Sequence, residues 1–190
     1  MKKVDYLNTQ NEVLTNSIET RKNTLENLSA DSFDSVAEFE KARDVAQKRL
    51  NEQVELKALL NDEKIQNVLF KFKFDMSKFT FAKYYDTREF KLRFAAFVKA
   101  LAYDNADHLR KYDDYFLRTV SKDLSAKKAL KYSRRKVHNE MRHKHDAKQT
   151  TQSNYFANFV RELSIAKDDR LSIEFDNESA LFKAIMNLYA

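Results

Sequence analysis

The first 28 residues place hydrophobic side chains in alternating steps of three and four positions. This spacing is typical of a helix that packs along one narrow seam against another helix, and two polar residues interrupt the seam. The flanking positions are nearly uncharged, so the ion pairs that usually specify a parallel dimer are missing. The seam positions are Val4, Leu7, Asn11, Leu14, Ile18, Arg21, Leu25 and Leu28.

A second helical pattern starts near Ser35, after the polar stretch 29–34. Ser35 and Glu38 have the spacing of a capping box, which begins a helix. We therefore expect residues 1–64 to form a long antiparallel helical hairpin, coiled-coil-like and about 40 Å long. A parallel dimer is the alternative. The candidate surface for a homo-oligomer or a protein partner is the seam of Leu7, Asn11, Leu14, Ile18 and Leu25.

Residues 65–190 predict a helical domain with a small two-stranded β-ribbon. Alternating apolar and polar residues at 70–76 and 171–175 indicate two half-buried strands. Residues 149–154 resemble a linker in composition. Apolar stripes at helical spacing lie at 90–101, 109–124, 155–163 and 181–188. The predicted fold class is thus mainly α, with the hairpin first and the helical domain second.

The positive charge of the chain is concentrated in residues 126–148, which we expect to form one basic helix beginning at Ser125. Residues 127–148 carry a net charge of +7, whereas the whole chain carries +6. A local excess of this kind focuses positive potential on a partner such as a phosphate backbone. The candidate nucleic-acid-binding residues are Lys127, Lys128, Lys131, Arg134, Arg135, Lys136, Arg142, Lys144 and Lys148.

Two other interpretations of the basic segment stay open. It could dock on an acidic protein surface, or it could be a solvated helix face. Membrane contact is not expected, because the thin apolar face lacks the large aromatic side chains of interfacial helices. No stretch of about 18 apolar residues could span a bilayer either.

The composition excludes several classes of chemistry, because Gly, Pro, Cys and Trp are all absent. Without glycine there is no phosphate-binding glycine loop, dinucleotide fingerprint or nucleophile elbow. Without cysteine there is no disulfide and no thiolate metal site. We expect a cytoplasmic protein without a signal peptide. The bias against GC-rich codons is typical of AT-rich genomes such as those of many bacteriophages.

No group of residues has the spacing of a catalytic or metal site. His138, His143 and His145 do not share one helix face, and neighbouring cations would repel a metal ion. Ser125 and Lys128 match a serine–lysine pattern, but helix capping explains Ser125 better. We therefore expect a non-enzymatic accessory protein, without metal or cofactor, that binds DNA or RNA. The alternative is an assembly adaptor or host-protein inhibitor that acts through the hairpin.

Overall fold

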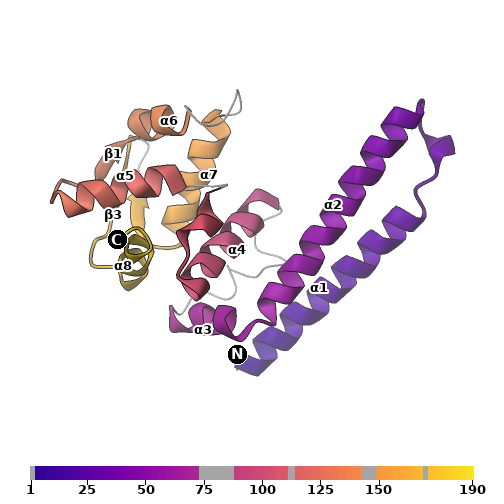
Figure 1. Cartoon of the computed structure of the whole chain (residues 1–190), viewed down its shortest axis with the longest axis horizontal. Helices are drawn as coiled ribbons and strands as arrows, with labels where there is room; N and C mark the ends of the chain where they lie inside the picture. The colour runs from indigo at the N-terminus through magenta and orange to yellow at the C-terminus, as the bar shows by residue number, and fades with distance from the viewer. Residues whose placement is uncertain (1–2, 73–87, 111–113, 143–148, 169–170) are drawn as a thin grey trace. The chain divides into compact units, whose positions relative to one another are not determined.

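The computed structural model describes residues 3–72, 88–110, 114–142, 149–168 and 171–190 (Figure 1). Helices predominate in these ranges, and a small antiparallel sheet accompanies them. The chain divides into two compact units, one with the described residues up to Gln66 and one with those from Asn67 onward. The mainly helical fold predicted from the sequence is confirmed.

The first unit is the antiparallel hairpin of helices α1 (Lys3–Glu26) and α2 (Val36–Leu60) (Figure 1). Asn11 and Asn61 exchange two side-chain amide hydrogen bonds of 3.0 and 2.9 Å across it. The Lys57 ammonium donates to the Thr15 hydroxyl at 2.7 Å. Asn11 is a polar interruption of the seam, so its pairing within the chain holds α1 and α2 in register.

The connection between α1 and α2 is the short 3-10 helix η1 (Ala30–Ser32), which lies between two serine caps. The Ser29 hydroxyl accepts the N–H of Asp31, and the Ser35 hydroxyl accepts the N–H of Glu38, both at 3.3 Å. These bonds satisfy N–H groups that the start of a helix leaves without a backbone partner. The predicted cap at Ser35 is confirmed.

Helix α3 (Glu63–Lys71) occupies the start of the segment predicted as a strand at 70–76. Asp62 caps it, since its carboxylate accepts the N–H groups of Lys64 at 2.8 Å and Ile65 at 3.1 Å. Ile65, Val68 and Leu69 are buried at helical spacing. The strand prediction is therefore wrong at residues 70–72, where this helical stripe and the turn after it prevail over the short alternation. Residues 73–76 lie outside the described part of the chain.

The second unit combines the remaining helices with the sheet. The α-helical segment at 149–154, predicted as a linker, belongs instead to a helix that continues to Glu162. The elements are α4 (Arg88–Tyr103), η2 (Ala106–Leu109), α5 (Asp114–Ser125), β1 (Lys131–Ser133), α6 (Arg134–Arg142), α7 (Gln149–Glu162), β2 (Ala166–Asp168), β3 (Ser172–Phe175) and α8 (Ala180–Asn187).

The sheet has three antiparallel strands in the order β1-β3-β2. The strand predicted at 171–175 is present as β3, but β1 and β2 are its partners. Ile173 and Phe175 of β3 are buried. Glu174 lies on the opposite, exposed face, in register with Lys131 of β1 and Lys167 of β2.

Aromatic rings form the centre of the second unit. Phe116 of α5 lies 5.2 Å from both the Tyr132 ring and the Phe156 ring, measured between centroids. Phe175 lies 5.4 Å from Phe182 and 6.1 Å from Tyr132. All five side chains are at most 5% exposed. This aromatic cluster joins α5, α7 and α8 to the buried face of the sheet.

Three helices end in a left-handed residue that is not glycine, namely Asp104, Lys127 and Ser164. At the end of α7, Ser164 has a φ of 54° and donates its N–H to the Arg161 carbonyl at 2.9 Å. The next N–H, of Ile165, reaches the Val160 carbonyl at 3.1 Å. This pattern is a Schellman motif, whose left-handed position usually holds glycine. A chain without glycine adopts it at a steric cost of about 1–2 kcal/mol.

We expect Ser164→Gly to raise the free energy of unfolding by about 1 kcal/mol, because glycine removes that steric cost. Urea unfolding followed by circular dichroism measures the change. Ser121→Gly, which places glycine inside α5, is expected to destabilise the protein by a similar amount. A loss of stability in Ser164→Gly would contradict the assignment of this cap.

Candidate nucleic-acid interface

The basic segment is not one helix, and this part of the prediction is wrong. Helix α5 ends at Ser125, β1 occupies Lys131–Ser133, and α6 runs from Arg134 to Arg142. Residues 143–148 lie outside the described part of the chain. The expected cap at Ser125 is also wrong, because its hydroxyl donates back to the Ser121 carbonyl at 3.0 Å, within α5.

A second Schellman motif turns the chain at the end of α5. Lys127 has a φ of 53° and donates its N–H to the Leu124 carbonyl, while the N–H of Lys128 reaches the Asp123 carbonyl, both at 2.9 Å. An ion pair of 3.2 Å between Lys128 and Asp123 joins the two positions that usually make a hydrophobic contact in this motif. The helix therefore stops here, and the chain continues into β1.

The first turn of α6 carries Arg134, Arg135 and Lys136. The Ser133 hydroxyl caps this turn by accepting the N–H of Lys136 at 3.1 Å. Helix N-termini favour negative charge, because the helix dipole is positive there. Three cations at this end add to the positive potential of the dipole instead of offsetting it, which makes the turn attractive to anions.

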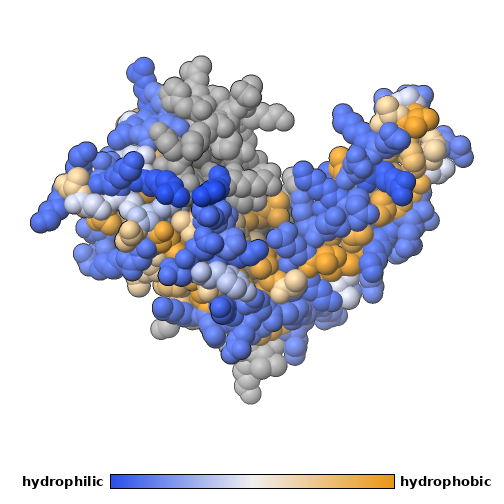
Figure 2. Space-filling view, viewed as in Figure 1, coloured by the Kyte–Doolittle hydropathy of each residue, from blue (hydrophilic) through white to orange (hydrophobic). Residues whose placement is uncertain are grey.

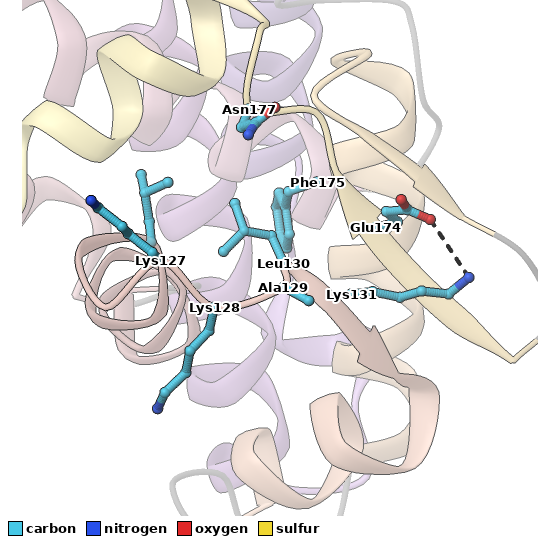
Figure 3. Close-up of a pocket in the computed structure, with 9 residues that line it drawn as sticks. Lys127, Lys128, Ala129, Leu130, Lys131, Glu174, Phe175 and Asn177 are labelled. Carbon is cyan, nitrogen blue, oxygen red and sulfur yellow. Dashed lines mark ion pairs between the residues drawn. The ribbon is translucent and has the colours of Figure 1, made fainter.

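A pocket of about 460 Å³ lies between the end of α5 and the β1–β3 pair (Figure 3). Figure 3 shows Leu130 and Phe175 at its centre, with the lysine side chains around it and Asn177 at one end. Leu130 accepts the N–H of Phe175 at 3.0 Å, which extends the β1–β3 pairing to the pocket floor. We call it the lysine pocket. Its lining residues are Leu124, Lys127, Lys128, Ala129, Leu130, Lys131, Glu174, Phe175 and Asn177.

Asp123 lies beside this pocket and contacts three neighbouring side chains. It pairs with Lys128, accepts the Tyr132 hydroxyl at 3.1 Å, and lies 3.9 Å from the Lys136 ammonium. Partial burial alone would raise its pKa, but the hydrogen bonds from Lys128 and Tyr132 and the nearby ammonium charges outweigh burial and lower the pKa. Burial, the Asp123 charge and their hydrogen bond raise the pKa of Tyr132.

A carboxyl whose pKa is lowered by folding stabilises the folded state above its unfolded pKa, and that contribution disappears as the pH falls. We therefore expect Asp123→Asn to lower the free energy of unfolding by about 1–2 kcal/mol at neutral pH. The difference from the wild type should shrink below about pH 4, where the carboxyl of the unfolded chain becomes protonated, and should vanish when the folded carboxyl is protonated at lower pH.

Urea unfolding at several pH values measures both effects. Glu178→Gln is the matched control, because Glu178 is an exposed carboxylate with 82% of its side chain accessible. A difference between wild type and Asp123→Asn that stayed constant down to acid pH would contradict this role of the ionised carboxylate.

Five of the described cations of the segment fall into two groups. Lys128, Lys131 and Lys136 have carboxylate partners, and the Lys131–Glu174 pair spans 3.6 Å with both side chains more than half exposed. Neither Lys127 nor Arg135 has an ion-pair partner among the described residues, and both are exposed. The side chains of all five residues are exposed, so all five positions are accessible to an anionic partner.

The other predicted binding residues are Arg134 and Arg142, which lie in α6, and Lys144 and Lys148. Arg134, in the first turn of α6, is half-buried. Arg142 is the last residue of α6, and Lys144 and Lys148 lie outside the described residues, as do His143 and His145. Asp123, Glu174 and the pocket floor could not be predicted as part of the site, because these residues come together only when the sheet forms.

The predicted seam lies along the hairpin. Leu14 is completely buried, and the bonded pair of Asn11 and Asn61 places this face of α1 against α2. Leu7, Ile18 and Leu25 are half-buried, so the hairpin leaves part of the seam accessible. Figure 2 shows hydrophobic surface along its length.

Within the described ranges, no three histidine, aspartate or glutamate side chains gather as metal ligands would. None of the described helices has the length and hydrophobicity to cross a membrane. Comparisons with protein-family models, curated proteins and solved structures give no match to this chain.

Proposed function

We propose that the protein binds nucleic acid, without catalysing a reaction, through the cations of residues 127–136. The observation that carries this proposal is their arrangement on one short stretch of surface. Lys127, Lys128 and Lys131 line the lysine pocket, and Arg135 and Lys136 follow in the first turn of α6. Such a surface suits phosphates spaced along a strand, whereas base edges would need a reading element that is not evident here.

The chemistry of the pocket supports a phosphate partner in two ways. Lysine ammonium groups release condensed counterions when they neutralise phosphates, which drives binding at low salt. The helix dipole at the start of α6 adds a partial positive charge next to the pocket lysines, which favours an anion. Lys131 would exchange Glu174 for a phosphate at small cost, because both side chains of that pair are more than half exposed. The exposed Lys128 ammonium would contact a phosphate while it stays beside Asp123, whose side chain is only 14% exposed.

The test is a fluorescence-anisotropy titration of the whole chain against duplex DNA, single-stranded DNA and RNA at several salt concentrations. With four or five phosphates neutralised, we expect a log–log slope of affinity against salt of about −3 to −5. Comparison of the three ligands identifies the preferred nucleic acid. Absence of binding to all three at low salt would refute the proposal.

A second candidate is an interaction protein that works through the hairpin. One observation favours it: residues 23–40, at the free end of the hairpin, expose hydrophobic side chains. Nucleic-acid binding and protein interaction through these two separate surfaces are compatible.

A further inference from the structure

The end of the hairpin, residues 23–40, carries hydrophobic side chains that the chain does not bury. We call this region the hairpin tip. Val36 is 71% exposed, and Phe33 and Phe39 are half-buried, with their ring centroids 5.8 Å apart. Figure 2 shows this hydrophobic surface at the tip. Single exposed aliphatic residues are ordinary, but a cluster with two phenylalanines indicates a contact surface.

The hairpin tip is also uniformly acidic. Between Asn23 and Glu40 there is no lysine or arginine. The tip thus combines exposed hydrophobic side chains with an excess of negative charge. Its five carboxylates belong to Glu26, Asp31, Asp34, Glu38 and Glu40.

The tip is already ordered in the free chain. The caps at Ser29 and Ser35 fix η1 and the start of α2, and Phe33 donates its N–H to the Ala30 carbonyl at 3.2 Å. The contact between Phe33 and Phe39 adds to this order. A preformed loop loses little conformational entropy when it docks, so a small contact area can suffice for association.

The lysine pocket of the second unit has the complementary composition. Leu130 and Phe175 form an apolar floor that is at most 9% exposed, with the exposed Ala129 beside it. Around this floor stand Lys127, Lys128 and Lys131, together with one carboxylate, Glu174, which pairs with Lys131 (Figure 3). A pocket of about 460 Å³ can hold several side chains. Exposed hydrophobic side chains accompanied by five carboxylates on one surface match an apolar floor on the other, whose rim carries three lysines and one glutamate.

We propose that the hairpin tip of one copy of this chain docks into the lysine pocket of a second copy. Val36 and the neighbouring phenylalanines would cover the apolar floor, and the tip carboxylates would face the lysines. The contact joins two different surfaces, so each bound copy still offers a free tip and a free pocket. Such a heterologous contact produces rings or open chains rather than a closed dimer.

Self-association through the pocket does not depend on the proposed nucleic-acid binding. If both occur, nucleic acid and the hairpin tip compete for the same lysines, and added nucleic acid dissociates the assemblies. If the chain does not bind nucleic acid, self-association is still measured in its absence. The two proposals therefore fail independently.

The experiment is sedimentation velocity on the full chain without nucleic acid, from about 1 to about 200 µM. At about 50 mM salt we expect concentration-dependent growth beyond a dimer, weakened at least tenfold at about 300 mM salt, where exposed charges are screened. A wild-type chain that stays monomeric over the whole range at low salt overturns the proposal.

Two variants locate the contact. The tip variant is Asp34→Lys, Val36→Ser and Glu40→Lys, and the pocket variant is Lys127→Glu and Ala129→Glu. All five positions are exposed, and circular dichroism checks that each variant folds. Each variant alone should lose self-association by at least tenfold. A mixture of the two should form a 1:1 complex and nothing larger, because only one intact tip and one intact pocket remain.

Matched controls separate this contact from a general effect of charge. Asp44→Lys, Val45→Ser and Glu55→Lys make the same changes on the shaft of the hairpin. Lys122→Glu and Ala180→Glu make the same charge change outside the pocket. Both controls should associate like the wild type. Tip and pocket variants that associate as strongly as these controls would overturn the proposal.

Discussion

Phe116→Ala is expected to lower the free energy of unfolding by about 3–5 kcal/mol, the largest stability change that we predict. Phe116 is 1% exposed and contacts the rings of Tyr132 and Phe156 at 5.2 Å. Alanine would remove this ring from the middle of the aromatic cluster and leave a cavity between α5, β1 and α7. Aromatic contacts beyond simple burial add to the loss.

Urea unfolding followed by circular dichroism and tyrosine fluorescence measures this effect. Phe116→Leu is the control, since it retains most of the buried volume and should cost about 1–2 kcal/mol. A loss below about 1 kcal/mol in Phe116→Ala would show that the cluster does not hold the second unit together.

The sequence predicted the hairpin well because its signals are local and long. The heptad spacing of α1 continues over more than three heptads, and the cap at Ser35 marks the start of α2. Asn11, a polar position of the predicted seam, bonds to Asn61 in the same chain. Long amphipathic helices with caps specify their structure through residues that are close in sequence.

The sheet was only partly predictable, because its strands are very short. β1 and β2 have three residues each, and β1 has one buried side chain, Tyr132. Three positions cannot display an alternation, so the strand depends on tertiary partners. The opposite error occurred at residues 70 and 71, where a strand was predicted and the structure has a helix. The alternation there follows directly on a buried helical stripe that includes Val68 and Leu69.

The break in the basic segment was hidden by the lack of glycine. Helix ends are commonly recognised by a glycine in the left-handed position, and here Lys127 occupies it. Its neighbours form hydrogen bonds and an ion pair with Asp123 that no spacing rule describes. The sequence predicted where the positive charge lies. It did not predict the lysine pocket, because the pocket depends on the turn at Lys127.

The second large effect concerns nucleic-acid affinity. We expect Lys127→Gln, Lys131→Gln and Arg135→Gln together to weaken binding by about 100- to 1000-fold near 0.1 M salt. Each side chain that no longer neutralises a phosphate removes about one counterion from the binding equilibrium. The log–log salt slope should therefore become shallower by about 3 for a duplex. The loss should be similar across sequences, because phosphate contacts carry no base specificity.

The control for this variant is Lys22→Gln, Lys41→Gln and Lys48→Gln, which removes the same charge from exposed positions of the hairpin. Net charge alone acts on both variants equally, so only contacts at residues 127–136 distinguish them. Dilute protein at nanomolar concentration keeps self-association out of the measurement. Equal weakening by both variants would mean that binding responds to overall charge, and the proposed interface would then be wrong. An unchanged salt slope in the 127–135 variant would assign any nucleic-acid contact to a different surface.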